Sequence, residues 1–160
     1  MTALRTGRLE IQIDGARASL AGRLDDACSL GELVAQLRAG DVTLDTAGIV
    51  FVNSAGMREW LRLVRALRGR GAVTLERVAD VLMTQMNLIL DSADRVRIAS
   101  FHAQYICPRC GSESAPLIDA VAHAAQLRAL APPPMPCGEC GAAMELGDFP
   151  ERYLSVFRRA

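Results

Sequence analysis

The order of hydrophobic and polar positions over the first hundred residues predicts alternating strands and helices. Residues 9–13 and 18–20 alternate apolar and polar side chains with period two, as half-buried strands do, and Asp14-Gly15 between them predicts a hairpin turn. Later segments repeat their apolar residues at helical spacing or form short apolar runs. In chain order the pattern predicts strands at 9–13, 18–20, 42–45, 49–52, 73–76 and 96–104, and helices starting near 29, at 55–68 and at 78–90.

Two local signals add detail to this pattern. Ser29 and Glu32 stand three residues apart at the start of an apolar helical repeat, so they predict a capping box there. The segment 49–52 is apolar without alternation, which favours a central strand covered on both faces. The resulting order predicts an α/β fold, a mixed β-sheet with helices packed on it.

The composition is that of a folded chain. The 160 residues fit one ordinary domain or two small ones, and 51% of them are hydrophobic against 22% charged, which favours a packed core over disorder. The 18 basic residues, all of them Arg, balance 18 acidic ones. This balance makes nucleic acid an unexpected partner, because binding to a phosphate backbone requires a basic excess.

The sequence predicts no association with a membrane. It has no run of about 18 apolar residues, the length that a membrane span requires. Its N-terminal segment also lacks the apolar stretch of a secretory signal. We therefore expect a cytoplasmic protein.

Five cysteines indicate where a metal binds. Cys28 stands alone, and we expect it to be a small buried residue. The other four form two Cys-x-x-Cys pairs, Cys107 with Cys110 and Cys137 with Cys140, each followed by glycine. In a cytoplasmic chain such pairs predict a metal site before they predict disulfides. Four thiolates form a closed tetrahedral site, typical of one structural Zn²⁺, with iron or a redox-active pair as the alternatives.

The cysteine pairs also indicate a second, small domain. They resemble the knuckles of a zinc ribbon, which predicts one domain at 1–104 and a zinc-ribbon-like domain at 105–160. The 26 residues between the pairs exceed a simple ribbon hairpin, and the apolar spacing of 115–130 predicts a helical insert there. His123 lies in this insert, but four thiolates already satisfy zinc, so it is not expected to bind the metal.

The turn after the strand at 49–52 has both a structural and a functional interpretation. It reads VNSAGM at 52–57. Structurally, Ser54 stands where a helix N-cap belongs and Gly56 permits close packing. An upstream turn, GRLD at 22–25, follows the second predicted strand.

Together the two turns resemble those of a STAS domain, the fold of bacterial anti-sigma factor antagonists, over residues 5–104. That family has a Gly-x-Leu-Asp turn after its second strand and an Asp-Ser-Ser/Thr-Gly turn before its second helix. Gly22, Leu24 and Asp25 match the first turn. Ser54 matches the serine that a partner kinase phosphorylates. The resemblance implies a STAS-like mixed β-sheet and a regulatory, protein-binding function.

The resemblance also implies a partner, an anti-sigma factor or a serine kinase. In the family the unmodified form binds a kinase anti-sigma factor, and phosphorylation ends that binding. Asn53 departs from the pattern by replacing the family's aspartate, and Ala55 replaces the second hydroxyl residue, so phosphorylation of Ser54 stays open. The expected partner-binding residues are Asp25, Asn53, Ser54, Arg58, Arg62 and Arg65.

Three of these residues, Arg58, Arg62 and Arg65, form a row opposite the apolar stripe of the predicted helix. Such a row can bind acidic residues of a partner, and it also fits an ordinary solvated helix face. In the same way, Asp25 fits a solvated turn carboxylate.

Three functions stay open. The first is a phosphorylation-controlled interaction module with the zinc ribbon as a second docking surface. The second is a STAS-type sensor of a small molecule, or a scaffold, in a groove near Asp25 and Ser54. The third is a nucleic-acid-binding ribbon, which the acidic residues around the knuckles disfavour. An enzyme is not expected, because the histidines, His102 and His123, lie far from Ser54 in the sequence and no phosphate loop is present.

Overall fold

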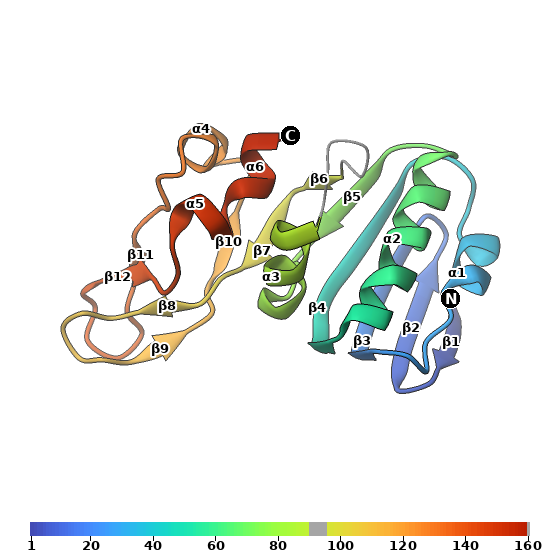
Figure 1. The fold of residues 1–160 in the computed structure, drawn as a ribbon, viewed down its shortest axis with the longest axis horizontal. Coiled ribbons are helices and arrows are strands. Elements are labelled where there is room, and N and C mark those ends of the chain that lie inside the picture. The colour runs from blue at the N-terminus through green and yellow to red at the C-terminus, as the bar shows by residue number, and fades with distance from the viewer. Residues whose placement is uncertain (90–95, 160) are drawn as a thin grey trace.

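The computed structural model describes residues 1–89 and 96–159, and within them the fold is mixed α/β, as predicted. Figure 1 shows a large sheet on the right and a smaller lobe on the left. The sheet has the order β1-β2-β3-β4-β5-β6, antiparallel from β1 to β3 and parallel from β3 to β6. Its strands are β1 (Thr2–Thr6), β2 (Leu9–Asp14), β3 (Arg17–Leu24), β4 (Val42–Val52), β5 (Val73–Glu76) and β6 (Arg97–Ile98).

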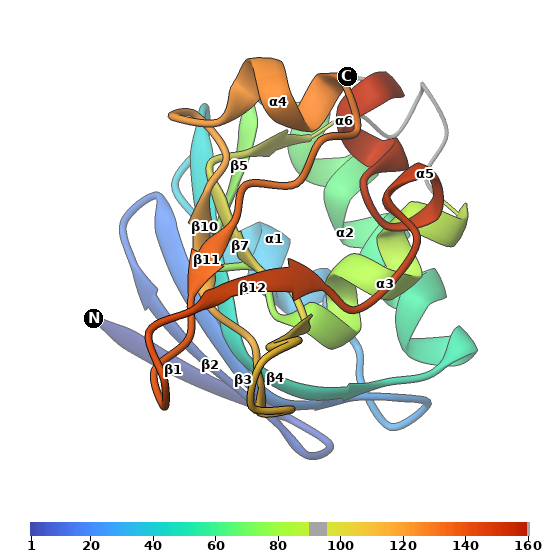
Figure 2. The ribbon, with the colours of Figure 1, turned by 90° about the vertical axis from the view of Figure 1, so that its left-hand side faces the viewer.

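Three helices belong to this sheet and lie on one side of it (Figure 2). They are α1 (Gly31–Gln36), α2 (Ser54–Arg68) and α3 (Asp80–Ile89). The longest, α2, buries its apolar stripe, in which Trp60 and Val64 are fully inaccessible to solvent. On the sheet, Leu9, Ile11 and Ile13 of β2 point into the same core while the residues between them are exposed, so the predicted period-two pattern is confirmed.

The smaller lobe is built from short elements around the cysteine pairs. A four-stranded sheet has the order β11-β12-β8-β9, and a separate antiparallel pair joins β7 to β10. The strands are β7 (Ser100–His102), β8 (Tyr105–Ile106), β9 (Glu113–Ser114), β10 (Leu117–Asp119), β11 (Met135–Pro136) and β12 (Ala143–Leu146). The helices are α4 (Ala124–Arg128), α5 (Pro150–Tyr153) and α6 (Ser155–Arg159). Among the described helices, none has the length and apolar character that a membrane span requires.

The two parts of the chain share an interface. β7 lies before residue 104 and β10 after it, so their pairing crosses the predicted domain boundary. The Tyr153 hydroxyl donates a hydrogen bond to Asp80 of α3. The Asn87 side chain of α3 accepts one from the backbone N–H of Val156, at 2.9 Å. The C-terminal helices of the lobe are therefore fixed to α3 by buried polar contacts and by the apolar residues around them.

The predicted helix at 115–130 is wrong over its first half. Residues 117–119 form β10, in which Ile118 pairs with Phe101 and both side chains are buried. The helix is only α4, and Val121 on its predicted apolar face is 57% exposed. Backbone pairing with a distant strand overrides the local helical spacing, because it satisfies the polar backbone groups while Ile118 enters the core.

Three smaller predictions also need correction. The segments 42–45 and 49–52 belong to one continuous strand, β4, and Val50 is 69% exposed, so the strand is not covered on both faces at that position. The predicted strand at 96–104 is divided into β6 and β7. Ser29 does not cap α1. The helix begins after Leu30, and Glu32 bonds Gln36 of the same helix instead of forming a capping box.

Candidate functional site: the Asn53 turn and the cysteine cluster

The turn between β4 and α2 is closed by Asn53. Its side-chain oxygen accepts a hydrogen bond from the backbone N–H of Gly56 at 2.9 Å, the geometry of an N-cap. The predicted cap, Ser54, is instead the first residue of the helix, and its side chain is exposed. Asn53 therefore takes over the cap, and this leaves the Ser54 hydroxyl at the helix surface.

The two turns that carry the STAS resemblance touch one another. The backbone N–H of Asn53 donates to the carbonyl oxygen of Leu24 at 3.2 Å. A Cβ on Gly56 would lie 1.9 Å from that same oxygen, so only glycine allows this approach. The prediction that Gly56 permits close packing is confirmed. The amino end of α2 is thus fixed directly to the turn that holds Asp25.

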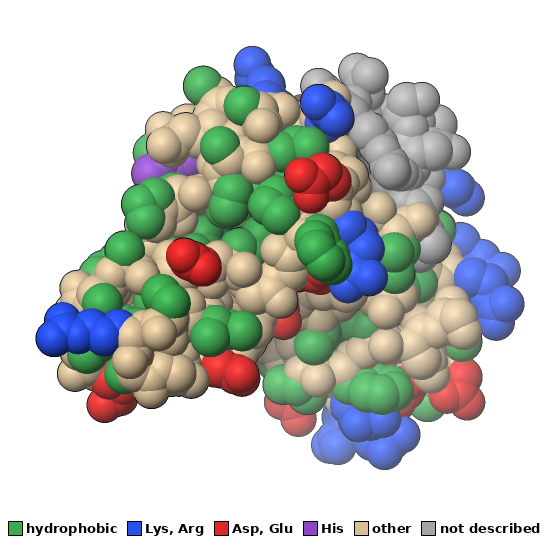
Figure 3. Space-filling view, turned by 60° about the vertical axis from the view of Figure 1, so that its left-hand side comes forward, with side chains coloured by type: hydrophobic (Ala, Val, Ile, Leu, Met, Phe, Trp, Pro, Cys, Tyr) green, Lys and Arg blue, Asp and Glu red, His purple; other side chains and the backbone are tan. Residues whose placement is uncertain are grey.

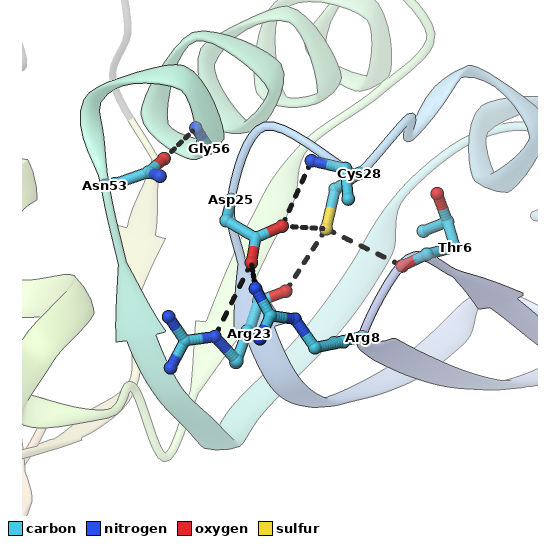
Figure 4. Close-up of polar contacts among 8 residues, drawn as sticks. Thr6, Arg8, Arg23, Asp25, Cys28, Asn53 and Gly56 are labelled. Carbon is cyan, nitrogen blue, oxygen red and sulfur yellow. Dashed lines mark hydrogen bonds and ion pairs between the residues drawn. The ribbon is translucent and has the colours of Figure 1, made fainter.

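Asp25 is buried, and four neighbours hold its carboxylate (Figure 4). Oδ1 accepts the backbone N–H of Ala27 at 3.1 Å and lies 3.9 Å from the Cys28 sulfur. Oδ2 accepts from Arg8 Nη2 at 3.1 Å and lies 3.5 Å from Arg23 Nε. The interpretation of Asp25 as a solvated turn carboxylate is therefore wrong. The Arg8 contact could not be read from the sequence, because it depends on the pairing of β2 with β3.

These contacts keep Asp25 ionised. Burial raises the pKa of Asp25. The N–H of Ala27 and the guanidinium groups of Arg8 and Arg23 lower it, and their combined effect is larger than that of burial, so the pKa lies below the usual 3.8. The Arg23 guanidinium also lies over the Phe51 ring of β4, 3.7 Å from its centre. Asp25 and Arg23 thereby join the ends of β3 and β4 beside Asn53.

Acid is expected to remove the stability that Asp25 contributes. Because its folded-state pKa is lowered, the contribution is complete above the unfolded pKa and is lost as the pH falls through the folded pKa. We expect the difference in unfolding free energy between wild type and Asp25→Asn, from urea titrations, to be constant above about pH 5 and to shrink below about pH 4. Asp26→Asn, a change at the exposed neighbour, is the control. A difference that stays constant down to about pH 2 would contradict this account.

Cys28 is buried beside this network, as predicted. Its thiol donates to the backbone oxygen of Arg23, at 3.1 Å, and lies 3.6 Å from that of Thr6. Burial is the main reason why the pKa of Cys28 is raised above its usual value, and the negative charge of Asp25 raises this pKa further. A buried thiol with a raised pKa is a weak nucleophile, so Cys28 acts as a packing residue.

The arginine row of α2 is exposed along its length. Arg58, Arg62 and Arg65 all face solvent, on the side opposite Trp60. Arg62 pairs with Glu59, which also accepts the backbone N–H of Leu30 at 3.3 Å. Glu59 thereby ties the start of α1 to α2, a link that the sequence did not indicate.

Replacing the cap tests its contribution to α2. We expect Asn53→Ala to lower the unfolding free energy by about 1 kcal/mol, because the N–H of Gly56 loses its acceptor. Asn53→Asp keeps an acceptor and places a negative charge at the positive end of the helix dipole, so its stability is expected to equal or exceed wild type. Chemical denaturation of the two variants measures both effects. Equal losses in both would show that the side-chain acceptor is not what caps α2.

The second candidate site is the cysteine cluster of the small lobe. Ligand atoms of Cys107, Cys110, Cys137 and Cys140 all lie within 4.8 Å of one another. The Cys107 sulfur lies 3.5 Å from that of Cys140, and the Cys110 sulfur 3.6 Å from that of Cys137. A tetrahedral ion with metal–sulfur bonds of about 2.3 Å needs sulfur separations of about 3.8 Å. The four thiols can therefore hold one metal ion.

The two cysteine pairs lie on two separate turns that have the same backbone conformation. Gly111 and Gly141 both have a φ of +75°, a left-handed conformation that glycine adopts without strain. Their N–H groups donate to the carbonyl oxygens of Cys107 and Cys137, both at 2.9 Å. The Cys-x-x-Cys-Gly pattern therefore forms the two turns that it predicts. His123 lies outside the cluster, and its Nδ1 is 2.7 Å from the Gln126 side-chain oxygen.

Ser112 contributes to this site, although it lies outside the Cys-x-x-Cys motifs. Its hydroxyl oxygen lies 3.2 Å from the Cys110 sulfur and 3.1 Å from the Cys137 sulfur. The Ser112 hydroxyl, with the backbone N–H groups of Cys140 and Glu139, lowers the pKa of Cys137 to about 6. Its position two residues after Cys110 was the available signal.

Four thiols at these distances cannot all ionise without a cation. The backbone N–H of Ala142 favours the thiolate of Cys140, but burial and the neighbouring thiols together raise its pKa to about 12. A divalent cation at the centre removes this repulsion, because each thiolate then faces opposite charge. The donor set and its electrostatics both fit a bound metal ion.

No protein-family model matches this chain, and no curated protein or solved structure matches it. The assignment of a function therefore rests on the two sites themselves. Of the sequence-predicted residues, the structure brings the four cysteines together. It also places Asn53 and Ser54 beside the turn that holds Asp25, and it sets Arg58 one helical turn beyond Ser54.

Proposed function

We propose that the N-terminal part of this chain is a STAS-like, non-enzymatic interaction module whose binding surface centres on Ser54. One observation carries the proposal. The Ser54 side chain is exposed at the start of a 15-residue helix, and that start is fixed to the turn of Leu24 and Asp25. The turns that support the family resemblance are thus adjacent in space. In this proposal Asp25 positions the surface from within and does not touch the partner.

Phosphorylation of Ser54 switches this surface. A phosphate adds about −1.5 to −2 charges, and the positive end of the helix dipole and the exposed N–H groups there favour an anion. The module stays folded while a partner over the turn meets new charge and bulk. The partner is an anti-sigma factor or serine kinase with acidic residues toward Arg58, Arg62 and Arg65. A groove of about 310 Å³ between α1 and α2, bordered by Glu59 and Arg62, extends the surface.

The four cysteines hold one structural Zn²⁺ in this proposal. The sulfur separations suit a tetrahedral ion, and four thiolates leave no open position for catalysis. The lobe then acts as a second docking surface. Nucleic acid is a poor partner for it, because Arg109 is accompanied by acidic residues: Glu113, Glu139, Glu145 and Asp148. Figure 3 agrees, since acidic and basic side chains are interspersed on the face it shows.

The mass of the protein purified from its own cells tests this function. The native spectrum counts the metal, and the denatured spectrum is expected to show a second species heavier by one phosphate. Fragmentation should place that phosphate on Ser54, and Ser54→Ala should remove it, whereas Ser29→Ala at another exposed serine should not. Absence of the phosphate in every growth phase overturns the switch.

Partner binding tests the surface itself. Ser54→Asp is expected to abolish binding of the protein that copurifies with the wild-type chain, and Ser19→Asp, at an exposed position of β3 away from the groove, is expected to retain it. Equal binding by both variants overturns the proposal. A STAS-type sensor of a small molecule in a groove near Asp25 and Ser54 then becomes the leading function, and the contact between the Asn53 turn and Leu24 is the observation that supports it.

A further inference from the structure

A cleft of about 260 Å³ opens where three distant segments of the chain meet. One wall is β6, the second is α6, and the third runs from the end of β10 into α4. Figures 1 and 2 both place α4 beside α6, and in Figure 1 this end of the molecule lies opposite the amino end of α2. The cleft is therefore distinct from the Ser54 turn and is lined by both parts of the chain.

The walls of this cleft are mostly apolar. Ile98, Ala124, Val156 and Phe157 contribute to its lining, and the Phe157 ring is held against Phe101, with the ring centres 5.1 Å apart. The backbone of Val156 is fixed by its hydrogen bond to Asn87. These contacts hold the wall formed by α6 in place, so the cleft is pre-formed, as small-molecule sites usually are.

Two arginines, Arg97 and Arg128, line this apolar cleft, and Arg97 also borders a second hollow that is lined by Asp14 and Asp41. Among the residues that the structure describes, no acidic side chain lines the cleft, and neither arginine has an ion-pair partner. They come from β6 and α4, which are far apart in the sequence. An apolar cleft bordered by two arginines is complementary to a molecule that has an apolar body and one anionic group.

We propose that this cleft binds a small amphipathic carboxylate. The carboxylate pairs with Arg97 and Arg128, and the hydrocarbon or aromatic body lies against Ile98 and Phe157. A bound molecule touches β6 and the α4–α6 lobe together, so it stabilises their junction in proportion to its concentration. The inference stands independently of the role of Ser54.

Octanoate and benzoate are suitable probes, since they carry the same anionic group on an aliphatic and an aromatic body. On the full-length, metal-loaded protein we expect at least one of them to raise the melting temperature and to give a saturable isotherm in calorimetry. Octanol and benzyl alcohol, which lack the charge, are expected to bind with an affinity lower by at least about tenfold. Arg128→Gln and Arg97→Gln should each weaken carboxylate binding about tenfold, and Arg5→Gln on the distant strand β1 should not.

A second variant separates the cleft from the arginines. Ala124→Leu fills the space while keeping both charges, and it is expected to abolish binding while the metal content stays that of wild type. Binding that is unchanged in Ala124→Leu, or in the Arg97→Gln/Arg128→Gln double variant, overturns the proposal. So does equal affinity for the alcohols, or failure of both carboxylates to bind. None of these outcomes depends on Ser54, so the partner-switch function is tested separately.

Discussion

Removal of the proposed metal ion is expected to unfold the cysteine lobe while the six-stranded sheet stays folded. The strands of the lobe are two to four residues long, too short to be stable by pairing alone. In small metal domains the binding free energy, about 10–16 kcal/mol for structural zinc in peptides, is the folding free energy. Loss of the ion also leaves thiols that cannot all stay ionised at separations near 3.5 Å.

Amide hydrogen exchange after chelation measures this effect. We expect protection to fall in residues 105–147 and to persist in β2, β3 and β4. Cys137→Ser should reproduce the loss with no chelator. Cys28→Ser is the matched control, because this cysteine lies in the N-terminal core and outside the cluster. A metal-free protein with full protection in the lobe would show that packing against α3 suffices to fold it.

Gly56→Ala is expected to be the most damaging single substitution at the Ser54 turn. The added Cβ would lie 1.9 Å from the backbone oxygen of Leu24 and 2.9 Å from the backbone nitrogen of Asp25. Neither atom can move without separating α2 from the end of β3. We expect a loss of about 3 kcal/mol in unfolding free energy, the upper part of the range for overpacked sites.

Gly31→Ala is the control for this substitution. It also adds a methyl group near the start of a helix, but nothing lies within 4 Å of the new atom. Its stability is expected to stay at the wild-type value or to rise by about 0.4–1 kcal/mol, because alanine has less freedom in the unfolded chain. Urea unfolding of both variants measures the difference. Similar losses at the two positions would contradict the close approach of α2 to Leu24.

At the Ser54 turn, short sequence motifs predict some structural features correctly and others wrongly. The turn, the glycine that it needs and the exposed face of the helix are all predictable from the sequence, because each depends on nearby residues. The predictions that Ser54 caps the helix and that Asp25 lies in solvent are wrong. The cap depends on the extended backbone angles of Asn53 at the end of β4. The environment of Asp25 depends on Arg8, which lies in the turn between β1 and β2 and contacts the carboxylate.

The sequence by itself determined the local structures: the hairpin after residue 13, the amphipathic helix α2 and the paired cysteine knuckles. Each is specified by spacing within about a dozen residues, so a single stretch of chain contains the information. Tertiary structure alone decided that residues 117–119 join β7 as a strand, that the lobe packs against α3, and that Arg97 and Arg128 line one cleft. These features arise from pairing and packing between segments far apart in the chain, which no local period encodes.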